Sequence, residues 1–428
     1  MNHFRKKGAP IYDFDAGVLN PATLKKSACG IPLYHITGNT MNVARIDFLF
    51  DAGAIFQTGK LIPSHCVSLL REGSELHTAS EIAEILDYHA VFTEPSFSRN
   101  KAGMGFYIDL KSAATVLPVI AAFLFRPVFP QEELDIFNQN SFQRLKIDYE
   151  KVKILAGKSI STRLFGAKHP LGAEIISEDV FGVTRNQLTD FHRTHYHAQS
   201  CSIVVSGNVG EELFHIIDNA IQPYIGEQKT ALIKPVYTEE TSPEKFEYIT
   251  KSGASQAAIR MGCLIDIDNM PDYHMLKVLN TLLGGYFGSR LMKNIREDKG
   301  LTYGIGSSVH LSGDKAVFNI SAEVAGDTWQ QALNEIDNEL SALVDKPITH
   351  EELMLVKKTM LGDKLAMFDG AFASSAALRS LLEAGLYYNF IEDGISAIHK
   401  ANEKILKNIA TTMITRDKMT VVVAGPEA

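Results

Sequence analysis

The chain has 428 residues, of which 42 are Lys or Arg and 50 are Asp or Glu, so its formal net charge is −8, and 45% of its residues are hydrophobic. This hydrophobic fraction excludes intrinsic disorder as the main state, and at roughly 100–200 residues per domain the length allows two to four domains. The mildly acidic balance gives no electrostatic reason to bind nucleic acid or an anionic membrane surface.

The start of the chain is charged and is not followed by an apolar segment, which argues against a secretory signal. The longest nearly apolar stretch, residues 112–125, is too short to span a bilayer. The cysteines are scattered singly, which fits reduced, buried thiols better than disulfides or a cysteine zinc site. Their positions are Cys29, Cys66, Cys201 and Cys263. These features predict a cytoplasmic protein.

Strands and helices alternate at short spacing in the first half of the chain. Residues 44–54 (ARIDFLFDAGA) predict a strand that runs into a turn. Thr78 and Glu81 have capping-box spacing, and the apolar residues after them recur at helical spacing. Residues 103–110 predict a second strand, and residues 113–125 predict a buried helix that ends before a proline.

Two pairs of similar strings indicate that the chain is duplicated. The triplet Glu-Glu-Leu at 132–134 recurs at 351–353, and each copy is expected to open a helix. The strand-like string SIVVSG at 202–207 resembles TVVVAG at 420–425. The two pairs have the same order and almost the same separation, which predicts two similar halves, residues 1–224 and 246–428. The linker between them is expected at 225–245, which shows no helical periodicity.

The second half repeats the mixture of elements. Residues 257–265 and 316–324 predict strands, residues 272–283 and 328–343 predict helices, and Thr349 has capping-box spacing to Glu352 before another helix. The expected fold class is α+β. It consists of two homologous layered domains, each a mainly antiparallel sheet packed with helices.

Several common functional motifs are missing from the sequence. There is no GxxxxGK[ST] and no GxSxG, and the glycines within 284–288 and 304–306 do not complete a dinucleotide fingerprint. We expect these glycines in turns or at helix entries. His192, His195 and His197 could form a metal cluster. We favour the interpretation that they close a helix, where cationic side chains suit the C-terminal dipole.

The order of elements and several strings resemble the pitrilysin/insulinase family of inverzincin peptidases, which includes the mitochondrial processing peptidase. The resemblance covers most of the chain. Its most specific string is REDKGLTYG at 296–304. Further matching strings are RPVF at 126–129, HPLG at 169–172, SGNV at 206–209 and SRL at 289–291. In this family a helix of the first half carries the zinc motif HxxEH.

This chain departs from the family at the zinc motif. By the resemblance, the two zinc-binding histidines fall at Ser64 and Ser68, and the catalytic glutamate falls at Val67. A zinc peptidase needs two imidazoles one helical turn apart and a carboxylate that takes a proton from the bound water. His65 lies one position away, which rotates its side chain by about 100° around the helix.

The resemblance places the third zinc ligand, a glutamate on a later helix, close to Lys146. Asp148 and Glu150 are near this position, but an acid without the two histidines makes no zinc site. We therefore expect no metal or other cofactor in this chain and no peptidase activity of the chain alone.

The second half keeps a family feature, an arginine and a tyrosine seven residues apart, at Arg296 and Tyr303. In the family these side chains reach the peptide across the chamber that contains the zinc. A guanidinium and a phenol can donate hydrogen bonds to a peptide carbonyl and to the oxyanion that develops from it. The alternative is that Arg296 forms a surface ion pair and Tyr303 packs within a strand.

The resemblance therefore implies a non-zinc, complementary subunit of a heterodimeric zinc metallopeptidase that cleaves peptides or unfolded segments. The expected partner is a homologous HxxEH chain that carries the zinc, and this chain could pair with itself when that partner is absent. The peptide is expected to bind as an added strand at an exposed sheet edge. The alternative is a catalytically inactive structural or peptide-binding homologue.

Overall fold

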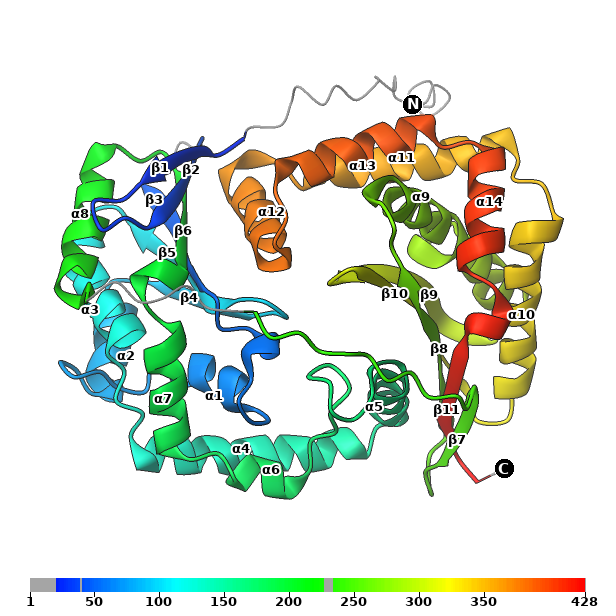
Figure 1. The fold of residues 1–428 in the computed structure, drawn as a ribbon, viewed down its shortest axis with the longest axis horizontal. Helices are drawn as coiled ribbons and strands as arrows, with labels where there is room; N and C mark the ends of the chain where they lie inside the picture. Colours follow the sequence, from blue (N-terminus) through cyan, green and yellow to red (C-terminus); the bar gives the residue numbers. More distant parts are fainter. Residues whose placement is uncertain (1–20, 39–40, 227–233, 428) are drawn as a thin grey trace, which may run out of the picture.

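The computed structural model describes residues 21–38, 41–226 and 234–427 (Figure 1). The interpretation of the N-terminal residues as free of a signal lies outside the described residues, and so does the part of the predicted linker at 227–233. The described residues form two sheets, each packed with helices, and Figure 1 shows these two layered halves side by side. The predicted α+β class is confirmed.

The first half contains a six-stranded sheet in the order β1-β2-β6-β3-β5-β4. Its strands are β1 (Thr23–Lys26), β2 (Pro32–Thr37), β3 (Val43–Phe50), β4 (Phe92–Phe97), β5 (Ala102–Asp109) and β6 (Cys201–Gly207). Its helices are α1 (Ile62–Ser68), α2 (Ala79–Tyr88), α3 (Ala113–Phe125), α4 (Gln131–Tyr149), α5 (Val152–Phe165), α6 (Ser177–Phe181), α7 (Arg185–His195) and α8 (Glu211–Ile221).

The second half contains a five-stranded sheet in the order β7-β11-β8-β10-β9. Its strands are β7 (Phe246–Thr250), β8 (Gln256–Asp266), β9 (Thr302–Ser312), β10 (Lys315–Ala325) and β11 (Thr420–Gly425). Its α-helices are α9 (Met270–Asn280), α10 (Trp329–Asp345), α11 (His350–Ala366), α12 (Gly370–Ala384), α13 (Tyr388–Lys400) and α14 (Glu403–Met413). Two π-helical segments, η5 (Thr281–Gly285) and η6 (Met292–Asp298), follow α9.

The two sheets repeat one arrangement of strands. In the first, β2 runs parallel to β6, and β6, β3, β5 and β4 then pair antiparallel. In the second, β7 runs parallel to β11, and β11, β8, β10 and β9 then pair antiparallel. The repeated strand strings form β6 and β11, which occupy equivalent places, and the two Glu-Glu-Leu strings lie at the starts of α4 and α11. The duplication predicted from the repeated strings is therefore present in the fold.

One helix from each half covers the sheet of the other half (Figure 1). The apolar face of α5 packs on β8 and β11, with Ile160 in one cluster with Ala258. The apolar face of α12 packs on the first sheet, where Leu378 lies among Leu49 and Val204. The two helices start at equivalent places of the two halves, since their separation along the chain equals that of the repeated strand strings. Each sheet thus needs a helix of the other half to cover apolar side chains, so the two halves stabilise each other.

The predicted helix starts are confirmed in one half and only partly in the other. At α2, the Thr78 hydroxyl accepts from the backbone N–H of Glu81, and the Glu81 carboxylate accepts from the N–H of Thr78, which completes the box. At α11, Thr349 accepts from the N–H of Glu352. The capping box also predicts that the Glu352 carboxylate accepts from the N–H of Thr349. This prediction is wrong, because the carboxylate instead accepts two bonds from Arg290, at 2.7 and 2.9 Å.

The expectation that the glycines at 304 and 306 lie in a turn or at a helix entry is wrong, because both lie in β9. Between the pairs Thr302↔Val324 and Ile305↔Ala322, β9 has one residue more than β10, so Gly304 lies in a β-bulge. Gly306 lies where η5 approaches β9 closely. Gly284 belongs to η5, and a Cβ on it would lie 2.6 Å from the Ser307 backbone nitrogen in β9.

The four cysteines are free. Cys66, Cys201 and Cys263 are buried, and burial raises the pKa of the Cys263 thiol to about 12. Cys29 is partly exposed. The four cysteines are unpaired, as predicted, and the prediction that all of them are buried is wrong for Cys29.

Candidate functional site

The three positions of the family's zinc motif lie on the short helix α1. The Ser64 hydroxyl donates to the Leu61 carbonyl oxygen at 2.9 Å, which is a bond within the helix start. Val67 is buried in the core of the first half, and Ser68 is exposed. These side chains offer no imidazole and no carboxylate, so the motif positions do not fit a zinc ion.

His65 serves as a packing residue next to these positions. It is 3% exposed, and the centre of its ring lies 4.8 Å from that of Phe137 on α4. Burial lowers its pKa to about 4, so its imidazole is neutral at pH 7. The single histidine of α1 therefore fills the contact between α1 and α4.

The residues near the expected third ligand are paired with lysines or exposed. Lys146 is exposed, and its ammonium lies 4.2 Å from the centre of the Phe142 ring. The Asp148 and Glu150 carboxylates form ion pairs with lysines at 2.9 and 2.7 Å. Within residues 21–38, 41–226 and 234–427, no group of three or more His, Cys, Asp or Glu is placed to hold a metal ion.

Arg296 and Tyr303 lie at the edge of the second sheet. Arg296 is part of η6, and Tyr303 is the second residue of β9, the last strand in the order of its sheet. Arg296 is half-buried, and its guanidinium carbon lies 4.7 Å from the centre of the Phe287 ring. In the described part of the chain it makes no ion pair and no hydrogen bond. Its donors are therefore available to a ligand.

The β-bulge turns Tyr303 outward. Tyr303 and Gly304 together lie opposite the single residue Glu323 of β10. The Thr302 hydroxyl fixes this irregularity, since it donates to the Glu323 carbonyl at 2.6 Å and accepts from the N–H of Gly304 at 3.1 Å. Bulges re-aim side chains in this way. Tyr303 is 93% exposed, so it lies in a strand but does not pack there.

The three histidines near the end of the first half are held separately. As predicted, His192 and His195 lie in the last turn of α7, and His197 follows it. One ring nitrogen of each histidine contacts a different acceptor: the Leu124 carbonyl at 2.9 Å, the Asp51 carbonyl at 2.7 Å and the Gln199 side-chain oxygen at 3.0 Å. The rings therefore do not converge on one point.

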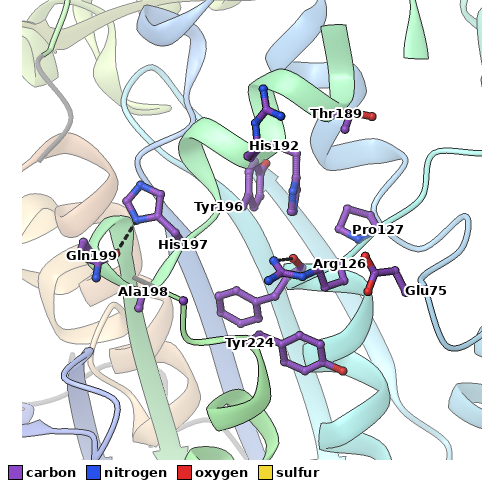
Figure 2. A pocket seen from close by; sticks show the side chains of 13 residues that line it. Glu75, Arg126, Pro127, Thr189, His192, Tyr196, His197, Ala198, Gln199 and Tyr224 are labelled. Carbon is purple, nitrogen blue, oxygen red and sulfur yellow. Dashed lines mark hydrogen bonds between the residues drawn. The ribbon is translucent and has the colours of Figure 1, made fainter. Parts of the chain in front are cut away.

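A pocket of about 520 Å³ lies at the end of α7 (Figure 2). His192, His197, Arg126 and Tyr224 are among its lining side chains, and Figure 2 shows the contact between His197 and Gln199. None of the residues predicted for peptide or zinc chemistry lines this pocket. It is separate from the candidate site at the edge of the second sheet.

The sequence did not predict a charge cluster that lies between the first sheet and α12 and is buried at Arg45 and Asp47. We call it the inter-half ion cluster, and it consists of Arg45, Asp47, Glu94 and Arg379. Arg45 donates to both oxygens of the fully buried Asp47 carboxylate, at 2.9 Å each. Glu94 on β4 contacts Arg45 at 2.8 Å and Arg379 at 3.1 Å. The available signal was an Arg and an Asp two residues apart in a strand that is otherwise apolar.

The comparisons with known proteins place the chain among peptidase relatives. Residues 182–360 match the family model described as the peptidase M16 inactive domain. The chain is 24% identical over 353 residues to the uncharacterized zinc protease YmxG of Bacillus subtilis, covering 81% of this chain and 84% of that protein. It is 23% identical over 366 residues to an uncharacterized zinc protease of Mycobacterium leprae, covering 84% and 81%. The predicted resemblance is confirmed.

Solved structures share the fold over nearly the whole chain. A peptidase M16 inactive domain from Pseudomonas fluorescens has a TM-score of 0.83 at 20% identity, covering 95% of this chain and 98% of that one. A protease from Helicobacter pylori has a TM-score of 0.84 at 16% identity, covering 95% and 100%. At these identities the likeness establishes the fold.

Among the described residues, no helix combines the length and apolarity needed to cross a membrane.

Proposed function

We propose that this chain, a relative of the M16 peptidases with the M16 inactive domain at residues 182–360, is the non-zinc subunit of a two-chain peptidase. Its partner is a homologous chain that carries HxxEH and supplies the zinc, the attacking water and the general base. This chain supplies Arg296 and Tyr303, which donate hydrogen bonds to the peptide carbonyl and to the oxyanion that forms when it is attacked. The substrates are peptides or unfolded segments.

The observation that carries this proposal is the state of Arg296 and Tyr303. Both side chains lie at the edge of the second sheet. Tyr303 is exposed, and Arg296 makes no ion pair among the described residues. A structural arginine normally gains a carboxylate, and a structural tyrosine normally buries its ring. Neither holds here, so both side chains keep their donors for a ligand.

The sheet edges supply the surface on which an extended peptide can lie. β4 and β9 are the last strands in the order of their sheets, so each has a side without a strand neighbour among the described residues. A peptide backbone can pair with such an edge and form an added strand. Binding along β9 would bring the peptide next to Tyr303.

The alternative function is a catalytically inactive structural or peptide-binding homologue. It is favoured by the zinc motif positions, which hold Ser64, Val67 and Ser68, and by the match to a domain described as inactive. It predicts that the chain adds nothing to the peptidase activity of any HxxEH chain.

The experiment that separates the two functions mixes the purified chain with an HxxEH homologue and measures cleavage of an unstructured peptide. The proposal predicts activity that rises with the chain until the two are equimolar. Arg296→Ala and Tyr303→Phe are each expected to lower kcat/KM by on the order of 100-fold, as for a lost oxyanion donor. Arg144→Ala and Tyr88→Phe change exposed residues of the same types elsewhere and serve as controls. If both site variants match the controls, the alternative function is correct.

A further inference from the structure

The side chains that flank Arg296 in the sequence bond to the acids of two neighbouring helices. Glu352 at the start of α11 accepts two bonds from Arg290. Glu335 on α10 forms an ion pair with Lys299, and Glu339 accepts from the side chain of Asn294 at 2.8 Å. These acids of α10 and α11 are therefore already bonded to other side chains, and Arg296 has no carboxylate partner among the described residues.

Phe287 provides the contact that a carboxylate would otherwise provide. The guanidinium carbon of Arg296 lies 4.7 Å from the centre of its ring, within the range of a cation–π interaction. A carboxylate would accept hydrogen bonds from two of the guanidinium N–H groups. The face of an aromatic ring attracts the cation but accepts none of the N–H groups that point outward in the plane of the guanidinium. The ring can therefore orient Arg296 and leave its donors unused.

The backbone that carries Phe287 is held on both sides. The N–H of Ser289 donates to the Tyr286 carbonyl at 3.2 Å, and Ser289 is 1% exposed. A Cβ on Gly288 would lie 2.8 Å from the Tyr286 ring, so a larger residue there would require that ring to shift. Phe287 itself is 61% exposed. A large apolar ring held at the surface by a hydrogen-bonded turn contributes little to the core, and its described partner is Arg296.

We infer that Phe287 is a positioning residue that holds the Arg296 guanidinium at the place where it meets the peptide. This inference rests on the proposed function, because it assigns the residue that orients the donor named there. Phe287 acts through Arg296 and does not itself hydrogen-bond to the peptide. Its ring limits the rotamers of a long side chain before the peptide arrives, so less freedom is lost on binding.

The first test of this inference needs no partner chain and no peptide. In the NMR spectrum of the isolated chain, the Nε–Hε signal of Arg296, assigned by its disappearance in Arg296→Lys, is expected to be shifted by the ring current of Phe287. Phe287→Leu keeps an apolar side chain but removes the ring, so the shift is expected to be lost, and Phe287→Tyr is expected to keep it. An Arg296 signal that does not move in Phe287→Leu overturns the inference.

The second test uses the mixture with the HxxEH chain. Phe287→Leu is expected to lower kcat/KM about 3- to 10-fold in the wild-type background, in keeping with one cation–π contact, and to have no further effect in Arg296→Ala. Phe287→Tyr is expected to keep the wild-type value. An equal loss in both backgrounds means that Phe287 acts independently of Arg296 and overturns the inference. If Arg296→Ala alone has no effect, the proposed function fails, and the NMR shift still decides whether Phe287 holds Arg296.

Discussion

Arg379 on α12 and Asp47 on β3 lie 332 residues apart in the chain, and their side chains meet at 3.3 Å (Nη1 to Oδ1) between the two halves. Asp47 is fully buried, and the Arg379 side chain is 16% exposed. A buried carboxylate is tolerated only where cations and donors surround it, and here they come from both halves. The inter-half ion cluster therefore makes the first sheet depend on a helix of the second half for charge balance as well as for apolar contact.

Arg379→Ala is expected to lower the free energy of unfolding by about 3 kcal/mol. Removing one partner of a buried ion pair costs about 3–5 kcal/mol, and we expect the lower end because Arg45 still bonds to both oxygens of Asp47. Urea unfolding measures this value. Arg416→Ala breaks an Arg–Asp pair with Asp337 whose side chains are 43% and 34% exposed, and it should cost less than about 1 kcal/mol. Equal losses in the two variants would contradict the role given to the cluster.

The buried His65 predicts a pH dependence of stability. The pKa of His65 is lowered from 6.5 to about 4 by burial, so between these pH values the unfolded chain binds a proton that the folded chain does not. The free energy of unfolding is therefore expected to fall by on the order of 3 kcal/mol as the pH falls from about 6.5 to about 4. His65→Phe should flatten this part of the profile measured by urea unfolding at several pH values. His215→Gln, at an exposed position of α8, should leave the pH profile of stability unchanged. An unchanged profile in His65→Phe would mean that the His65 imidazole is solvated and would contradict this prediction.

The close approach of η5 to β9 predicts an effect of adding one methyl group. Gly284→Ala would place a Cβ 2.6 Å from the backbone nitrogen and the hydroxyl of Ser307, and the required shift should cost about 1–3 kcal/mol. Gly304→Ala meets nothing within 4 Å and should change stability by less than about 0.5 kcal/mol. Thermal unfolding of the two variants checks this difference, and a tolerated alanine at 284 would show that η5 moves freely relative to β9.

Zinc content tests the interpretation of α1. The isolated chain, purified without chelators, is expected to contain far less than one zinc per molecule by mass spectrometry, because Ser64 and Ser68 cannot replace two imidazoles. The triple change Ser64→His, Val67→Glu and Ser68→His restores the helix ligands but not the third ligand, so it should raise zinc content only weakly. Stoichiometric zinc in the unchanged chain would mean that the metal is held by other residues.

Local patterns were sufficient to predict several strands and helices and the duplication. β6, β11 and the starts of α4 and α11 carry similar strings because each is set by neighbours in sequence: a buried strand favours Val and Ile, and a helix start favours Glu. The capping box at Thr78 and Glu81 could be predicted for the same reason. The box at Thr349 was half wrong because Arg290, 62 residues away from Glu352, competes for its carboxylate.

Contacts between distant residues could not be predicted from a single sequence. Arg45 and Asp47 were visible only as charges in a strand, because Arg379 belongs to a helix of the other half and no local pattern links them. The exchange of α5 and α12 between the halves has the same cause. The glycine at 304 was misplaced because glycine usually marks turns, and its role in a bulge depends on the register with β10.

In the proposed function, Arg296 and Tyr303 complete the active site of an HxxEH chain. The most direct measurement is kcat/KM for peptide cleavage by that chain alone, with the wild-type protein, and with the double variant Arg296→Ala/Tyr303→Phe at equimolar concentration. We predict little activity for the HxxEH chain alone, full activity with the wild-type protein, and a loss on the order of 100-fold or more with the double variant. Full activity of the HxxEH chain alone, or equal activity with the wild-type protein and the double variant, would contradict the claim.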